Sequence, residues 1–287
     1  MTARIIDGAA VARQIRSQLT TRIAALKAKG VTPGLAVVMV GEHPASRAYV
    51  GNKTRACAES GLHSEVHALD GGSAASLVLA TIDKLNRDPR IHGIIVQLPL
   101  PHDFDTTRIT QSVAVEKDVD GFRWHSLGAL VAGHPTLAPC TPLGVMALLD
   151  QARVALEGKY AVVVGRSVTV GKPMALMLIA RGATVTVCNS RTPDLGEVTR
   201  RADVLVAAAG KPGLITAAMV KRGAVVIDVG INRSPQGGIV GDVHFASVKE
   251  VASLITPVPG GVGPMTVAMV IANTVTAAER VVATRTA

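Results

Sequence analysis

The chain has 287 residues, of which 48% are hydrophobic and only 2% aromatic. This length and apolar fraction suit a globular protein of two domains, and the dense blocks of Val, Ile, Leu and Ala exclude a disordered chain. The formal charge of +9 comes from scattered Lys and Arg with almost no aromatic residues. That pattern argues against nucleic-acid binding and favours an anionic small ligand or a solvated surface.

The N-terminal residues lack a signal-peptide pattern and lead directly into an amphipathic helix. The apolar face of this helix comprises Val11, Ile15, Leu19, Ile23 and Leu26. No uninterrupted apolar run approaches the ~18–20 residues of a membrane-spanning helix, so no membrane partner is expected. The three cysteines are far apart, which favours neither disulfides nor a zinc site. We therefore expect a cytoplasmic protein without a metal site.

The first half of the chain alternates β-branched runs with helical stretches, which is typical of an α/β domain with a mainly parallel sheet. The expected strands are 35–40, 64–69 and 93–97, and the expected helices are 46–60 and 74–86. Residues 104–140 are mixed and broken by Gly and Pro. A helix at 142–153 is expected to lead into the second domain.

A second α/β series occupies the rest of the chain. The expected strands are 160–164, 184–188, 204–207 and 225–229, with helices at 173–181 and 265–282. The last helix is apolar enough to pack back on the first domain. We therefore predict one domain from residues 1–140 plus 265–287 and another from residues 141–264.

The segment YAVVVGRSVTVGKP contains a strand, a tight turn and the start of a helix. Gly165 stands where the backbone turns and approaches a ligand closely, and Pro173 suits a first helical turn, whose free N–H groups attract phosphate. Ser167 and Val170 replace the later glycines of a dinucleotide fingerprint, and the P-loop pattern is also absent. The motif alone is therefore weak evidence for a nucleotide site.

The next strand strengthens the case for a nucleotide. It ends in Asn189, Ser190 and Arg191, at the place where an NAD site carries Asp or Glu. A hydroxyl and a guanidinium instead fit the 2′-phosphate of NADP, and Arg166 offers a second charge. From spacing alone, the alternative that both arginines are ordinary exposed turn residues stays open.

Tyr49 and Lys53 lie four residues apart on an expected helix and share a face. The same spacing serves proton transfer in short-chain dehydrogenases, but there the cofactor glycines come before the pair, whereas here they follow it. Gln97 ends a buried strand, which is a common ligand position. A surface lysine beside a half-buried tyrosine, and a loop amide bonded to local backbone, are the alternatives.

Two further segments carry candidate groups. Asp118 and Asp120 flank Val119 before Gly121, where a turn or a carboxylate that binds a ligand's N–H groups is favoured over a metal site. The segment TPVPGGVGP forms a rigid loop whose backbone can approach a flat ligand, or else a plain link to the last helix. His63 and His67 fall in strand-like sequence, and we interpret them as structural.

Taken together, seven segments resemble the bifunctional methylenetetrahydrofolate dehydrogenase/cyclohydrolase (FolD) family. They are, in family order, PASRAYVGNKTRAC, GIIVQLPLP, KDVDGF, PCTPLGV, VVVGRSVTVGKP, GAVVIDVGINR and ITPVPGGVGPMT. The resemblance covers nearly the whole chain. It implies a three-layer α/β catalytic domain and a Rossmann-type NADP-binding domain.

The resemblance implies two reactions in one-carbon metabolism, a pathway that also serves purine biosynthesis. 5,10-Methylenetetrahydrofolate gives a hydride to NADP⁺, and water then opens the methenyl product to 10-formyltetrahydrofolate. By position, Lys53 is the central cyclohydrolase residue, Gln97 tunes it, Tyr49 stacks on the folate and Asp120 holds the pterin. The other folate-binding positions implied are Val50, Leu98, Pro257, Pro259, Gly260 and Gly261.

The nucleotide positions implied by the resemblance are Gly165, Arg166, Ser167, Ser190, Arg191 and Ile231. A homodimer built on the cofactor domain is also implied. The chain departs from the family at Arg123–Ser126 and at His244, where the usual residues differ. Three alternatives stay open. Lys53 and Gln97 argue against a dehydrogenase without cyclohydrolase activity, and Lys53 and Asp120 argue against a silent binding protein. A shikimate-dehydrogenase-like enzyme would not explain the segment VPGGVGP.

Overall fold

The computed structural model describes residues 2–41, 44–234 and 237–286, and the side chains of these except 44–49 and 285–286. The chain folds into two compact units. Unit 1 comprises Met1–Ala12 with Thr141–Thr266, and unit 2 comprises Arg13–Cys140 with Val267–Ala287. Each is an α/β unit built on its own parallel sheet, so the expected fold class is confirmed.

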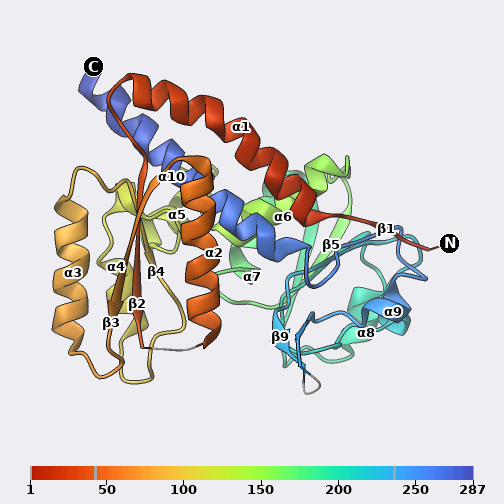
Figure 1. Cartoon of the computed structure of the whole chain (residues 1–287). Helices are drawn as coiled ribbons and strands as arrows, with labels where there is room; N and C mark the ends of the chain where they lie inside the picture. Colours follow the sequence, from red (N-terminus) through yellow and green to blue (C-terminus); the bar gives the residue numbers. More distant parts are fainter. Residues whose placement is uncertain (1, 42–43, 235–236, 287) are drawn as a thin grey trace. The chain divides into compact units, whose positions relative to one another are not determined.

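Unit 2 is built on a three-stranded parallel sheet in the order β3-β2-β4. The strands are β2 (Gly34–Val40), β3 (His63–Leu69) and β4 (Gly93–Val96). Helices α2 (Pro44–Ser60) and α3 (Ala75–Arg87) lie on opposite faces of this sheet (Figure 1). These five elements match the expected ones within a few residues, and they give the expected three layers.

Apolar periodicity explains how this unit packs. The central strand β2 is buried over its whole length, as expected of a strand covered on both faces. On the α3 side, alternate residues of β2 contact a helical stripe three or four residues apart. The stripe consists of Val78, Ile82 and Leu85, and the strand residues are Ala36, Val38 and Val40.

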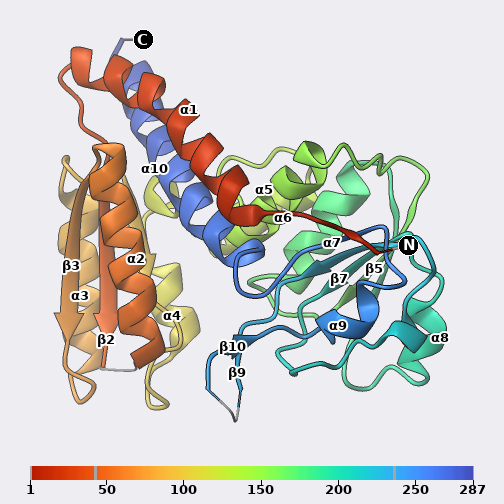
Figure 2. The ribbon, with the colours of Figure 1, turned by 45° about the vertical axis from the view of Figure 1, so that its right-hand side comes forward.

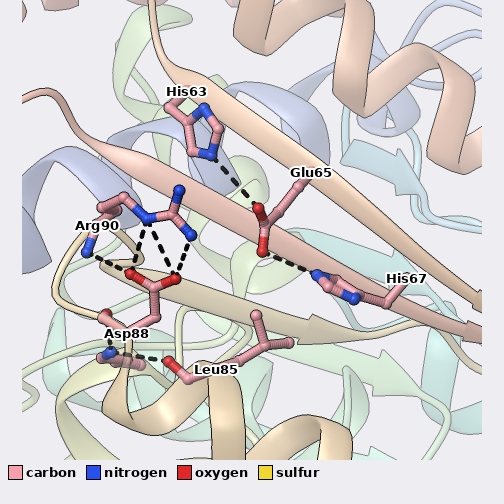
Figure 3. Close-up of polar contacts among 7 residues, drawn as sticks. His63, Glu65, His67, Leu85, Asp88 and Arg90 are labelled. Atoms are coloured by element: carbon pink, nitrogen blue, oxygen red, sulfur yellow. Dashed lines mark hydrogen bonds and ion pairs between the residues drawn. The ribbon is translucent and has the colours of Figure 1, made fainter.

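The edge strand β3 carries three polar side chains, those of His63, Glu65 and His67, on the face of the sheet that α3 covers. Figure 3 shows His63 and His67 turned toward the carboxylate of Glu65 from either side. His67 Nε2 lies 2.8 Å from Glu65 Oε1, and His63 Nε2 lies 3.5 Å from Glu65 Oε2. The hydrogen bond from His67 holds the pKa of Glu65 below its ordinary value. Charged groups on an edge strand also discourage pairing with another sheet.

Three short helical segments and parts of two long helices complete unit 2. Helix α4 (Thr106–Gln111), the 3₁₀ turn η1 (Val115–Lys117) and helix α5 (Trp124–Val131) occupy the stretch whose sequence is mixed and broken by Gly and Pro. The later part of α1 (Gly8–Ala28) and the later part of α10 (Val262–Thr286) also belong here. Arg22 joins these two helices through a bidentate pair with Glu279, at 2.6 and 2.8 Å.

Unit 1 is built on a six-stranded parallel sheet in the order β1-β11-β8-β7-β5-β6. Its strands are β1 (Arg4–Ile5), β5 (Tyr160–Val164), β6 (Thr184–Cys188), β7 (Val204–Ala207), β8 (Val225–Asp228) and β11 (Leu254–Ile255). The sequence-based division placed residues 1–140 in the first domain. Instead, β1 pairs with β11, which draws the first twelve residues into unit 1.

Helices and a small hairpin surround this sheet (Figure 2). The helical segments are α6 (Cys140–Gln151), α7 (Gly171–Ala180), α8 (Leu195–Thr199), the 3₁₀ turn η2 (Ala217–Met219) and α9 (Phe245–Val248). The short strands β9 (Asn232–Arg233) and β10 (Ile239–Val240) pair antiparallel. The central strands β5, β7 and β8 are almost wholly buried, because helices cover a parallel sheet on both faces.

Helix α10 is long and apolar enough to cross a membrane by length and composition alone. However, 61% of its most apolar window is buried inside the protein, and core helices of soluble proteins pass the same test. Its apolar character is therefore explained by packing.

Candidate functional site

The carboxyl end of the unit 2 sheet brings Lys53 and Gln97 together. Lys53 projects from α2 and is only 5% exposed, and its Nζ donates a hydrogen bond of 3.1 Å to Gln97 Oε1. Gln97 follows β4, where its backbone N–H donates to Val38 O, and its side-chain amide donates to Leu98 O. The amide therefore has a fixed orientation, with its oxygen directed at the lysine. The two residues are 44 positions apart in sequence.

Asp120 provides an acidic group beside this pair. Residue 118 forms a parallel bridge with Ile94 of β4, so the segment that carries Asp120 extends the sheet. The pKa of Asp120 is raised to about 6, mainly by burial; the charge of Lys53 lowers it, and the nearby Asp118 carboxylate contributes to the rise. An acid near Lys53 was not expected from the sequence, because the two residues lie on separate elements.

Asp118 is buried and supports the turn that holds Asp120. Its carboxylate accepts hydrogen bonds from the backbone of Phe122 at 3.2 Å and Arg123 at 2.9 Å, and from Ser126 Oγ at 2.7 Å. The segment Arg123–Ser126, where the chain departs from the family pattern, therefore anchors this turn. Three donors from the chain itself already bind the Asp118 oxygens, so this carboxylate serves the turn.

Asn273 of α10 is a member of this site that was not predicted from the sequence. Its side-chain amide donates to Val119 O at 2.8 Å and to Ala138 O at 3.0 Å, and it is buried. The Cys140 thiol donates to the same Val119 oxygen at 3.1 Å. Both residues on the N-terminal side of Asp120 are thus held by buried hydrogen bonds. A polar residue within an apolar helix was the signal available in the sequence.

The remaining folate-binding candidates fall in different places. Val50 is buried in α2, Leu98 is half-buried beside Gln97, and Tyr49 lies in α2 with its side chain outside the described part. The loop residues Pro257, Pro259, Gly260 and Gly261 belong to unit 1. There Gly260 O accepts from Ala9 N at 3.0 Å, and a Cβ on Gly8 would lie 1.8 Å from Gly261 O. This loop therefore packs tightly on the start of α1.

In unit 1, the loops that follow the neighbouring strands β8, β7, β5 and β6 meet at the carboxyl end of the sheet. Gly165 N donates to Cys188 O, Ala208 N to Val164 O and Val229 N to Ala207 O. Gly165 has φ 134°, and a Cβ there would lie 2.1 Å from Ala208 O. Only glycine fits this close approach. In open parallel sheets, ligands bind at this carboxyl edge.

The candidate nucleotide residues lie on these loops. Ser167 Oγ accepts from Val170 N at 3.1 Å and Gly171 N at 3.2 Å, so it shapes the turn into α7. The side chains of Arg166, Ser190 and Arg191 are exposed, and Ile231 is 46% exposed. Within the described residues, neither arginine forms an ion pair. The expected free N–H groups are not found in the first turn of α7, because Gly171 N and Lys172 N already donate to Ser167 and Pro173 has no N–H. The close backbone approach at Gly165, here called the glycine cradle, and the two available guanidinium groups fit a phosphorylated dinucleotide.

The described part of the chain contains no candidate metal site. Among the described residues, no group of three His, Cys, Asp or Glu side chains is arranged to hold a metal ion. His244, the other departure from the family, is exposed and contacts Ser247 at 2.7 Å.

Two family models match the chain. Residues 6–120 match the catalytic domain of tetrahydrofolate dehydrogenase/cyclohydrolase, and residues 139–282 match its NAD(P)-binding domain. The chain belongs to this family. The matched regions correspond to the first sheet with its lysine site and to the second sheet with its glycine cradle.

Relatives and solved structures agree with this assignment. The bifunctional protein FolD of Nitrosospira multiformis is 59% identical, over 98% of this chain and 97% of its own. The structure of FolD from Campylobacter jejuni has a TM-score of 0.95 at 48% identity, over 97% of this chain and 99% of that one. FolD from Trypanosoma brucei, solved with NADP and an inhibitor, has a TM-score of 0.95 at 38% identity, over 98% and 99%.

Replacement of Asn273 tests its role in holding the Asp120 segment. N273A leaves Ala138 O without its side-chain donor, and Val119 O keeps only the Cys140 thiol, so the free energy of unfolding should fall by about 1–3 kcal/mol. Denaturation by urea measures this loss. The control T284A alters an exposed residue of the same helix and should change stability by less than about 0.5 kcal/mol. Equal stability of N273A and the unaltered protein would contradict this role.

Proposed function

We propose that this chain oxidises 5,10-methylenetetrahydrofolate with NADP⁺ and then hydrolyses the methenyl product to 10-formyltetrahydrofolate. The observation that carries the proposal is the buried Lys53, bonded to Gln97 beside Asp120, in a region that matches the family's catalytic domain. Unit 2 then binds the folate and unit 1 binds the nucleotide, which is the function of the domain that residues 139–282 match.

The folate is recognised by groups at the carboxyl end of the unit 2 sheet. The Asp120 carboxylate is fixed by its neighbours' hydrogen bonds and accepts from the N–H groups of the pterin. Tyr49 stacks on the aminobenzoyl ring, while Val50 and Leu98 supply apolar contacts. For residues 257–261, a folate contact stays a prediction from the family resemblance.

The oxidation step needs alignment more than acid–base chemistry. NADP⁺ supplies the hydride acceptor when it is bound. The neighbouring folate nitrogen assists departure of the hydride, so the chain's task is to hold two carbons at contact distance. In unit 1, the Gly165 turn allows the dinucleotide to approach the backbone closely, and the exposed guanidinium groups of Arg166 and Arg191 favour its phosphates.

The hydrolysis step requires proton handling. Water oxygen bonds to the methenyl carbon, the bond from that carbon to the N5 nitrogen breaks, and one proton is released overall. We assign the transfer to Lys53 Nζ, which is buried and held by Gln97 Oε1. The fixed amide keeps the amine directed at one position, which favours transfer in a single geometry.

Two absorbance assays test the function and the role of Lys53 together. The unaltered protein should reduce NADP⁺ with methylenetetrahydrofolate, and should accelerate the decay of added methenyltetrahydrofolate without nucleotide. K53A should lower the hydrolysis rate by about 10²-fold or more, because the proton carrier is lost. Its oxidation of methylenetetrahydrofolate should remain measurable.

The control K84A removes an exposed lysine of α3 and should leave both rates unchanged. Full hydrolysis by K53A would remove Lys53 from the mechanism. No turnover by the unaltered protein with either nucleotide would overturn the proposed function, and reduction of NADP⁺ without faster methenyl decay would leave a dehydrogenase alone.

The raised pKa of Asp120 predicts a pH dependence of folate binding. A carboxyl group with a pKa of about 6 is protonated below that pH and then loses its charge as an acceptor. The KM for methylenetetrahydrofolate should therefore rise as the pH falls below about 6. D120N should show a high KM at every pH, and it serves as the control for ionisation of the substrate itself. A parallel pH profile in both proteins would exclude Asp120 as the titrating group.

The choice of NADP over NAD rests on the residues after β6. Ser190 and Arg191 stand where an NAD site carries an acid, so R191D should weaken NADP⁺ far more than NAD⁺. We expect kcat/KM for NADP⁺ to fall by about tenfold or more, from loss of a charge-assisted pair with the 2′-phosphate. R222D alters an exposed arginine just before β8, at the opposite edge of the sheet, and is the control. An unchanged preference in R191D would mean that this side chain points elsewhere.

We also propose a cytoplasmic homodimer that serves one-carbon metabolism, including purine biosynthesis. β6 is an edge strand of the unit 1 sheet, and its Val187 is 39% exposed. Ile179 of the adjoining α7 is 54% exposed. Apolar side chains on and beside an edge strand support a second copy as the partner of this face.

A further inference from the structure

Asp242 is a fully buried carboxylate that joins two loops of unit 1. Its Oδ2 accepts from Ala209 N at 2.6 Å and Gly210 N at 2.8 Å. Its Oδ1 accepts from Lys211 N at 2.9 Å and from the side-chain amide of Asn232 at 2.8 Å. One side chain thus fixes three successive N–H groups after β7 and an amide after β8.

A second buried carboxylate holds Asp242 in place. Asp228, the last residue of β8, accepts from the backbone N–H of Asp242 and Val243, both at 2.9 Å. The fit around the pair is tight, because a Cβ on Gly241 would lie 1.8 Å from Asp228 Oδ2. A Cβ on Gly230 would lie 2.4 Å from Asp242 Oδ1. Such a closely packed arrangement holds the loops in one geometry.

The loops fixed in this way are those that border the glycine cradle. Ala208, directly before the three bonded N–H groups, carries the oxygen that faces Gly165. Ile231, directly before Asn232, is the exposed residue assigned to the nucleotide. We propose that Asp242 is a positioning residue that holds both loops ready for NADP⁺. This inference rests on the proposed function, since it deepens the account of the same nucleotide site.

The charge of Asp242 is essential to this role. Each of its oxygens faces two N–H donors, and an ionised carboxylate accepts from all four. In D242N one oxygen becomes an NH₂ group, so at least one backbone N–H after β7 would face another donor in either orientation of the amide. Four charge-assisted bonds become at most three neutral ones, and the backbone after β7 must move.

The experiment compares D242N with D203N, a matched control in the same sheet. Asp203 also accepts from a backbone N–H, that of Tyr160, and pairs with Lys221 at 2.6 Å, but it lies at the opposite edge. Direct titration with NADP⁺ should show a Kd about tenfold higher or more for D242N, and a nearly unchanged Kd for D203N. The nucleotide-independent methenyl hydrolysis should persist in both variants.

Hydrogen exchange in the nucleotide-free protein supplies a readout beyond activity. D242N should lose protection at Ala209, Gly210 and Lys211, with the strands β5 and β7 still protected. An unchanged Kd in D242N, the same loss in D203N, or exchange raised evenly over the unit would overturn the inference.

A milder variant covers the case in which D242N does not fold. N232A removes one donor of Asp242 and leaves its three backbone bonds, so Kd for NADP⁺ should rise by about fivefold. An unaltered Kd in N232A would also overturn the inference. If the unaltered protein fails to bind NADP⁺, the proposed function fails. If the unaltered protein binds NADP⁺ and the variants bind it equally tightly, only the positioning role fails.

Discussion

Backbone N–H groups in the loops that follow buried strands need hydrogen-bond acceptors. In this chain, aspartate carboxylates supply many of these acceptors. An unpaired buried donor costs about 1–3 kcal/mol, and an unpaired buried carboxylate costs more. Asp118, Asp228 and Asp242 are each less than 5% exposed, and each accepts at least two backbone N–H groups. In the loops of both candidate sites, these hydrogen bonds compensate for the loss of water around the buried carboxylates and N–H groups.

The need to satisfy buried polar groups also distinguishes carboxylates that stabilise a loop from a carboxylate that binds a ligand. Asp118 and Asp120 are two residues apart, yet Asp118 receives three donors from its own chain. Asp120 is instead desolvated beside Lys53, with a raised pKa, which suits a group that meets an external ligand. The turn at Gly121 allows this difference, because a Cβ there would lie 2.6 Å from the backbone at 138 and 139.

Elements with strong local patterns were predictable from the sequence. The buried strands β2, β5 and β7 are short apolar runs rich in Val, and α3 has a regular apolar stripe. The two-residue strands β1 and β11 were not predicted, because so short a segment has no periodicity and forms only when its partner is present. Consequently residues 1–12, expected with the first domain, group with unit 1 instead.

The candidate sites divide in the same way. Lys53, Gln97 and Asp120 could be named from motifs, but the hydrogen bond from Lys53 to Gln97 joins different elements and needed the fold. Asn273 and Asp242 were missed because each is a single polar residue whose partners lie far away in sequence or on several loops. The only local signal for Asn273 was a polar residue within an apolar helix, and that signal does not reveal which atoms the residue binds.

The strand pairing also limits how the protein can be divided. Neither unit is one continuous stretch, since unit 1 needs residues 1–12 and unit 2 needs the last part of α10. A gene fragment for residues 141–266 would lack β1 and leave β11 as a bare sheet edge, open to pairing with other chains. The two units therefore cannot be separated by a single cut, and a recombination event that exchanged one unit would have to join four segments at three junctions.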